Sequence, residues 1–231
     1  MSSIRENILL LENSIRAAAL AAGRRPEEIG FLLVTKTVPA EKIKEGVQAG
    51  AADFGENRVQ ELLAKKKLLA PGLRWHMIGH LQTNKVRQIL GEVVLIHSLD
   101  RPELAAEIGR AARAKKIPAV DCLVQVNSTG EETKFGLAPE DAEDFVASLP
   151  ADSPIRVKGL MTIGPLTAAE GEIRKAFRLL KRMQEQFQKR FPEKSWDVLS
   201  MGMSGDYRIA IEEGATLLRI GRAVFGERIK S

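Results

Sequence analysis

Short apolar runs alternate with helical stretches along this chain, and eight such runs can be counted. They lie at residues 31–35, 53–55, 75–78, 93–96, 120–126, 157–163, 196–200 and 217–220. This alternation predicts an α/β protein with a parallel sheet, either an open doubly wound sheet or a closed barrel. Eight units favour closure, because closure removes both sheet edges. We therefore predict a (β/α)8 TIM barrel.

A helix is predicted before the first run. Ser3 and Glu6 have the spacing of a capping box, and apolar residues recur at helical spacing up to a stop near Gly23. A barrel of this type needs about 250 residues, and the chain has 231. No linker or repeat interrupts the pattern, so we expect a single barrel domain over residues 1–231 with an extra N-terminal helix.

Charge and cysteine content narrow the class of protein. The net charge of +5 is compatible with phosphate or nucleic-acid binding, but acidic residues are scattered throughout and no basic tail exists. The cationic run 65–67 is typical of a solvated helix face, and no nucleic-acid partner is expected. The single cysteine, Cys122, lies in an apolar run and is predicted to be buried. Without a signal-peptide pattern or an apolar stretch of about 18 residues, we expect a cytoplasmic protein with no membrane contact.

Lys36 is the first candidate for chemistry. In such barrels the working residues lie at the carboxyl ends of the strands, and Lys36 directly follows the first apolar run. A partly desolvated lysine has a lowered pKa and more free amine for attack on a carbonyl. The alternative is an ordinary cation that emerges into solvent beyond the strand.

Two glycine-containing segments follow the last two runs. Residues 202–206 (GMSGD) and 221–223 (GRA) offer backbone N–H groups and a hydroxyl, which suit a phosphate between the seventh and eighth strands. The alternative is two tight turns that merely need glycine. A phosphate site facing a strand-end lysine suggests an aldehyde that carries a phosphate, and pyridoxal 5'-phosphate (PLP) fits both features.

Eight segments in order resemble the pyridoxal phosphate homeostasis protein family. They are FLLVTK (31–36), FGENRVQE (54–61), WHMIGHLQTNK (75–85), QVN (125–127), KFGL (134–137), GLMTI (159–163), SMGMSGD (200–206) and RIGRAVFG (219–226). Each alone is a weak signal, but together they run from the first predicted strand to the last. The resemblance implies a barrel like the N-terminal domain of alanine racemases.

The resemblance also implies roles for eight residues in binding PLP. They are Lys36 as the Schiff-base lysine, Asn57 near the aldehyde side, Gly202 and Met203 as residues that shape the phosphate loop, Ser204 on the phosphate, Arg219 at the pyridine nitrogen, and the backbone of Gly221 and Arg222 on the phosphate. Such proteins often carry threonine where this chain has Arg222, so only a main-chain role is carried over there.

The same resemblance favours a binding protein over a catalyst. A guanidinium at the ring nitrogen disfavours protonation of that nitrogen and weakens the ring as an electron sink. Alanine racemases add a tyrosine base from an extra domain of the partner subunit, whereas this chain has one tyrosine, Tyr207. We expect a monomer, without catalytic residues or a metal, that holds PLP reversibly, buffers its level and passes it to PLP-dependent apoenzymes. The histidines 76, 80 and 97, placed near two strand ends, lack metal-ligand spacing. The alternatives are a one-domain PLP-dependent amino-acid racemase and a lyase that forms a Schiff base with a sugar phosphate.

Overall fold

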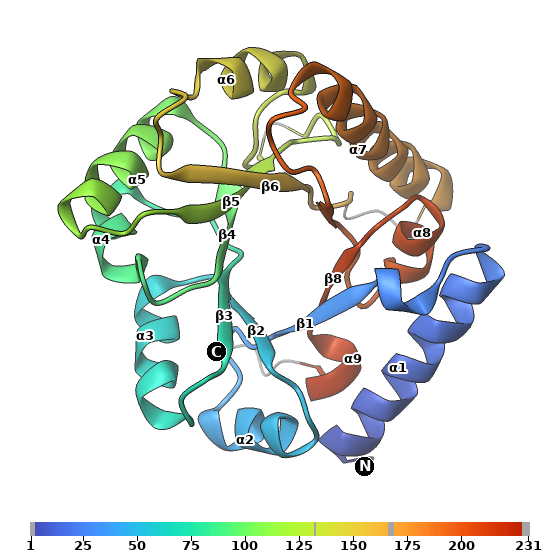
Figure 1. The fold of residues 1–231 in the computed structure, drawn as a ribbon. Helices are drawn as coiled ribbons and strands as arrows, with labels where there is room; N and C mark the ends of the chain where they lie inside the picture. The colour runs from blue at the N-terminus through green and yellow to red at the C-terminus, as the bar shows by residue number, and fades with distance from the viewer. Residues whose placement is uncertain (1–2, 132, 166–168, 228–231) are drawn as a thin grey trace.

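Eight parallel strands close into a barrel in chain order, from β1 to β8 and back to β1. The computed structural model describes residues 3–131, 133–165 and 169–227, so both ends of the predicted 1–231 domain lie outside it. Figure 1 looks along the barrel, with the strands as an inner ring and the helices outside. The predicted TIM barrel is confirmed. Its strands are β1 Gly30–Val34, β2 Asp53–Glu56, β3 Arg74–Met77, β4 Leu95–Leu99, β5 Val120–Gln125, β6 Ile155–Met161, β7 Val198–Ser200 and β8 Leu217–Ile220.

The helices bury their apolar faces against the outer surface of this ring. Among the described residues, none is both long and apolar enough to cross a membrane. The helices are α1 Ile4–Ala21, α2 Ala40–Gln48, α3 Val59–Leu68, α4 Val86–Ile89, α5 Pro102–Ala114, α6 Ala142–Ser148, α7 Glu170–Arg190, α8 Tyr207–Glu212 and α9 Arg222–Phe225, with 3-10 turns at Pro26–Glu28, Thr83–Lys85 and Pro139–Asp141.

The extra N-terminal helix α1 begins as predicted. The Ser3 hydroxyl accepts from the Glu6 N–H, and the Glu6 carboxylate accepts from the Ser3 N–H at 2.8 Å. These bonds satisfy two amides that the first helical turn would otherwise leave unpaired. The buried face of α1 contacts α8, α9 and α2, so the helix covers the seam where the last strand meets the first (Figure 1).

The fourth strand differs most from its prediction. It was expected at 93–96 but begins at Leu95 and runs through His97 and Ser98, both of which are fully buried. The polar residues hid this strand in the sequence, because an apolar run was the signal sought. His97 was expected near a strand end; it instead lies within the strand, and its ring is buried through hydrogen bonds.

Alternation along the strands separates an outer core from a barrel interior. Outward residues such as Leu33 and the buried Cys122 pack in the main core, which confirms the prediction for that thiol. Inward residues form two smaller clusters: one contains Leu32, Val34 and Ile78, the other Leu95, Leu123 and Met161. Because successive residues face opposite sides of a strand, this parity decides which side chains reach the mouth of the barrel.

Candidate functional site

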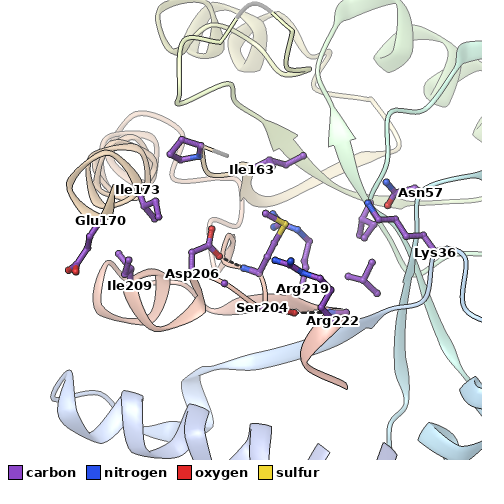
Figure 2. A pocket seen from close by; sticks show the side chains of 16 residues that line it. Lys36, Asn57, Ile163, Glu170, Ile173, Ser204, Asp206, Ile209, Arg219 and Arg222 are labelled. Carbon is purple, nitrogen blue, oxygen red and sulfur yellow. Dashed lines mark hydrogen bonds between the residues drawn. The ribbon is translucent and has the colours of Figure 1, made fainter. Parts of the chain in front are cut away.

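A cavity of about 580 Å³ opens at the carboxyl ends of the strands. In Figure 2, Arg219 and Ser204 lie between Lys36 on one side and Asp206 on the other. The lining combines a lysine, two arginines and a glycine-containing loop with an apolar wall. Its residues are Val34, Lys36, Asn57, Ile78, Ile163, Pro165, Glu170, Ile173, Met203, Ser204, Gly205, Asp206, Ile209, Arg219, Gly221 and Arg222.

Strand parity directs Lys36 into the cavity. Leu32 and Val34 face the barrel interior, and Lys36 continues the same alternation just beyond β1. The next residue, Thr37, has a φ of 62°, a left-handed conformation that is rare for a β-branched residue. The Thr37 N–H donates to Glu61 Oε1 at 2.6 Å, which holds this turn in place. Backbone strain fixed in this way is common where a functional side chain must be aimed.

A buried ionic cluster supports the other side of the same turn. Lys65 Nζ donates to the Thr35 carbonyl at 2.6 Å, to Glu56 Oε1 at 2.7 Å and to Glu61 Oε1 at 2.6 Å. The prediction of a solvated face at 65–67 is therefore wrong for Lys65, whose ammonium group is paired and buried. Burial raises the pKa of Glu56, although Lys65 and the Thr35 hydroxyl oppose that shift. The cluster fixes the backbone on both sides of Lys36.

Asn57 follows β2 and is placed by a close approach to the loop after β3. A Cβ atom on Gly79 would lie 2.4 Å from the Asn57 carbonyl oxygen, so only glycine allows the two loops to touch. This contact brings the Asn57 side chain to the rim of the cavity.

The loops after β7 and β8 meet at the Ser204 hydroxyl. Ser204 Oγ accepts from the Gly221 N–H at 3.3 Å and from the Ala223 N–H at 3.2 Å. Two amide hydrogens that converge on one oxygen form an environment suited to an anionic oxygen. The loop depends on Gly202, whose φ is 92° and whose absent Cβ would lie 2.6 Å from Ala210 Cβ.

Arg219 is the buried cation at the floor of the cavity. Its Nη1 donates to Ser200 Oγ at 2.8 Å and its Nη2 to the Thr162 carbonyl at 2.7 Å. Burial lowers the pKa of Arg219 to about 10, and the negative charge of Asp206 opposes that shift. The guanidinium therefore remains protonated at neutral pH. Asp206 also accepts from the Met203 N–H and so closes the turn around Ser204.

Most of the residues predicted for the site come together here. Lys36, Asn57, Met203, Ser204, Arg219, Gly221 and Arg222 line the cavity, and Gly202 lies behind the loop, where it sets the turn. The side chain of Arg222 is 60% exposed, and its Nη1 lies 3.7 Å from Glu227 Oε1.

The sequence analysis missed two features of the site. One is the buried ion pair between Glu56 and Lys65, and the other is the role of Asp206 in closing the loop around Ser204. The glycine-flanked loop was a signal for Asp206, because a carboxylate that ends such a loop commonly accepts from its backbone amides. Tyr207, the only tyrosine, does not line the cavity as described; its hydroxyl bonds to Ser14 Oγ of α1 at 2.7 Å.

Comparisons with known proteins agree on one family. The sequence pattern of the alanine racemase N-terminal domain family matches residues 4–229. The chain is 45% identical over 215 residues to the pyridoxal phosphate homeostasis protein of Aquifex aeolicus, covering 93% of each chain.

Solved structures add the fold and one ligand-bound relative. The PipY protein of Synechococcus elongatus, solved with PLP bound, is 32% identical with a TM-score of 0.85, covering 97% of this chain and all of PipY. An alanine racemase of Clostridium difficile shares only the fold, at 15% identity and a TM-score of 0.76 over 99% of this chain and 57% of that enzyme.

Proposed function

This chain belongs to the family of the pyridoxal phosphate homeostasis proteins, and from that membership we propose that it binds PLP reversibly and takes part in intracellular PLP homeostasis. The observation that carries the proposal is one cavity that joins a strand-end lysine to a two-loop anion cradle. We further propose that it acts in the cytoplasm as a monomer and delivers PLP to PLP-dependent apoenzymes.

The residues of the cavity fit the chemistry of PLP. Its phosphate needs hydrogen-bond donors without a bulky side chain between them, and the amides that converge on Ser204 Oγ offer that arrangement. Its aldehyde needs an amine, which Lys36 offers on the same cavity. Its aromatic ring needs apolar contacts, and Val34, Ile78 and Ile163 line the wall.

Each group of the chain then has a role in binding. PLP supplies an aldehyde, which condenses with an amine to form a Schiff base and release water. We assign that amine to Lys36, and the phosphate to Ser204 with the backbone of Gly221 and Arg222. Gly202 and Met203 shape that loop, and Asn57 lies at the rim on the side of the aldehyde. Arg219, protonated at neutral pH, would hold the ring nitrogen unprotonated by charge repulsion.

Binding without robust turnover is the function that these groups favour. A racemase needs a second base across from the lysine, and the hydroxyl of Tyr207 bonds to Ser14 on the outer helix α1. The unprotonated ring nitrogen would also stabilise a carbanion poorly. The family membership and the position of Tyr207 support a carrier of PLP over a one-domain racemase.

Absorbance and chemical trapping test the assignment of Lys36. Purified protein mixed with PLP should turn yellow, and borohydride should bleach it with a mass gain on the peptide that contains Lys36. Lys36→Ala should abolish both signals, whereas Lys42→Ala, a change at an exposed lysine of α2, should keep them. Full absorbance and unchanged trapping in Lys36→Ala would contradict the assignment. A chiral assay with L- and D-amino acids that detects robust turnover, lost in Lys36→Ala, would favour the racemase.

A further inference from the structure

A row of hydrogen bonds crosses the interior of the barrel and ends at Arg219. From Arg219, it runs through Ser200 Oγ to His97 Nδ1 at 3.1 Å, then from His97 Nε2 to His76 Nδ1 at 3.1 Å. The last step joins His76 Nε2 to Asp53 Oδ1, also at 3.1 Å. The five residues come from β2, β3, β4, β7 and β8.

These residues occupy space that barrels of this class fill with branched apolar side chains. His97 and Ser200 are fully buried, and His76 and Arg219 are only 6% and 4% exposed. The apolar interior clusters contain Ile78, just beyond β3, and Leu95 of β4, so apolar and polar interior residues follow one another along the chain at both strands. Burying polar groups costs free energy unless each is hydrogen-bonded, so this row is a complete arrangement rather than isolated substitutions.

If both imidazoles are neutral, the hydrogen bonds of the row can run in only one direction, from Arg219 toward Asp53. Ser200 Oγ accepts from Arg219, and its own hydroxyl hydrogen is then donated to His97 Nδ1. His97 therefore carries its hydrogen on Nε2 and donates to His76 Nδ1. His76 in turn carries its hydrogen on Nε2 and donates to Asp53. The opposite direction would leave a neutral His76 with a lone pair facing a carboxylate.

The charges at the two ends maintain this direction. Burial opposes ionisation of Asp53, but hydrogen bonds from His76 and Arg74 outweigh it and lower its pKa to about 2. The row therefore ends in an anionic acceptor at Asp53, and it begins at the guanidinium of Arg219. Between them, burial lowers the pKa of His97, and the positive charge of Arg219 adds to the effect. His97 is thus neutral at physiological pH.

We propose that Asp53, His76 and His97 act through Ser200 as positioning residues that hold Arg219 in one orientation toward the ring of the bound cofactor. The proposal rests on the proposed function for the identity of that cofactor. Within the part of the chain that the structure describes, the Arg219 guanidinium donates to Ser200 Oγ and to the Thr162 carbonyl. If the hydroxyl is removed, a single carbonyl holds the guanidinium, which can then turn about that bond.

Matched serine variants test whether the hydrogen-bond row holds Arg219 in place. Ser200→Ala removes the link to Arg219, whereas Ser98→Ala removes a fully buried hydroxyl of β4 that has no hydrogen-bond partner among the described residues. Titration with PLP, followed by absorbance, should give a dissociation constant about tenfold weaker for Ser200→Ala, since a hydrogen bond to a charged group is lost. Ser98→Ala should bind like the unmodified protein. Equal affinity and an equal absorption band in Ser200→Ala would overturn the proposal.

Histidine variants test whether the row acts as a unit. His97→Leu should weaken PLP binding about as much as Ser200→Ala, and the double variant should be little weaker than either, because both break one chain. His97→Gln, whose amide can both accept and donate, should recover part of the affinity. Additive losses in the double variant, with no recovery in His97→Gln, would indicate a merely structural role.

A measurement on the protein without ligand keeps this test separate from the proposed function. The chain has three histidines, so nitrogen-15 NMR of the imidazoles gives three ring systems that single substitutions can assign. We expect His76 and His97 both with hydrogen on Nε2 and none on Nδ1. Hydrogen on Nδ1 of His97 would refute the proposed direction of the hydrogen-bond row even if PLP binds. If borohydride traps no PLP on Lys36 while the expected tautomers are seen, the proposed function fails and the hydrogen-bond row remains.

Discussion

Ser204 Oγ accepts a hydrogen bond from the Gly221 N–H at 3.3 Å, which joins the loop after β7 to the start of α9. One oxygen thereby connects two segments that the chain separates by an entire β/α unit. The proposed cradle for the phosphate depends on this contact, since two amides of the segment after β8, those of Gly221 and Ala223, converge on the hydroxyl of the loop after β7.

Ser204→Ala should weaken the binding of PLP about tenfold, because one donor to a charged phosphate is lost. Pyridoxal, which has the same aldehyde and ring but no phosphate, is the matched ligand and should bind both proteins alike. The dissociation constants come from absorbance titrations. An equal loss for both ligands would mean that Ser204 does not act on the phosphate.

Gly202→Ala should lower the free energy of unfolding by about 1–3 kcal/mol, because it adds a Cβ where neither the space nor the backbone conformation allows one. The φ of 92° and the 2.6 Å approach to Ala210 Cβ are the causes. Gly171→Ala, in α7 with nothing within 4 Å of the new Cβ, is the control and should leave stability equal or higher. Urea unfolding measures both variants. Equal stability of the two variants would contradict the steric argument.

Lys65→Met should cost about 3–5 kcal/mol of unfolding free energy, because it leaves the buried carboxylate of Glu56 without its cation. Lys66→Met, one residue along α3, removes a half-exposed ion pair with Glu92 and should cost less than about 1 kcal/mol. Chemical denaturation at neutral pH compares the two variants. Similar costs would show that the Glu56 cluster does not depend on Lys65.

Stability should fall as the pH drops below about 6.5, in part because of His97. Burial holds the pKa of His97 well below 6.5 in the folded protein, whereas the unfolded chain takes up that proton near its ordinary value. The unfolded state therefore binds more protons at acid pH, and unfolding becomes easier by up to about 1.4 kcal/mol per pH unit. In His97→Leu this part of the slope should vanish. Urea midpoints at pH 5 and pH 7 test this, and an unchanged slope would rule out His97 as its source.

The barrel was predictable because apolar runs alternate regularly with helical stretches along the chain. The mouth of the site was predictable because its residues directly follow such runs. Apolar runs located seven strands closely, and the ends of β1, β7 and β8 gave Lys36, Ser204 and Gly221. These signals are local in the chain. Domain extent, the cofactor roles of single residues and the monomeric state stay predictions.

The interior of the barrel was not predictable in the same way. His76 and His97 lie 21 positions apart, and neither has a sequence context that indicates a buried hydrogen bond between them. Lys65 belongs to a run of three lysines, and only the position of Glu56 on β2 decides which of them is buried. Such pairings depend on how strands from distant parts of the chain align, and a pattern of residue types does not record that alignment.

The pairing of β1 with β8 sets Leu32 beside Arg219. Lys36 lies just beyond β1, whereas Ser204 and Gly221, on the other wall of the cavity, lie beyond β7 and β8. These walls come from segments far apart in the sequence, and the pairing of the last strand with the first brings them together. The cavity is therefore a property of the closed barrel, and a chain in which β8 has not yet paired with β1 has only separate parts of it.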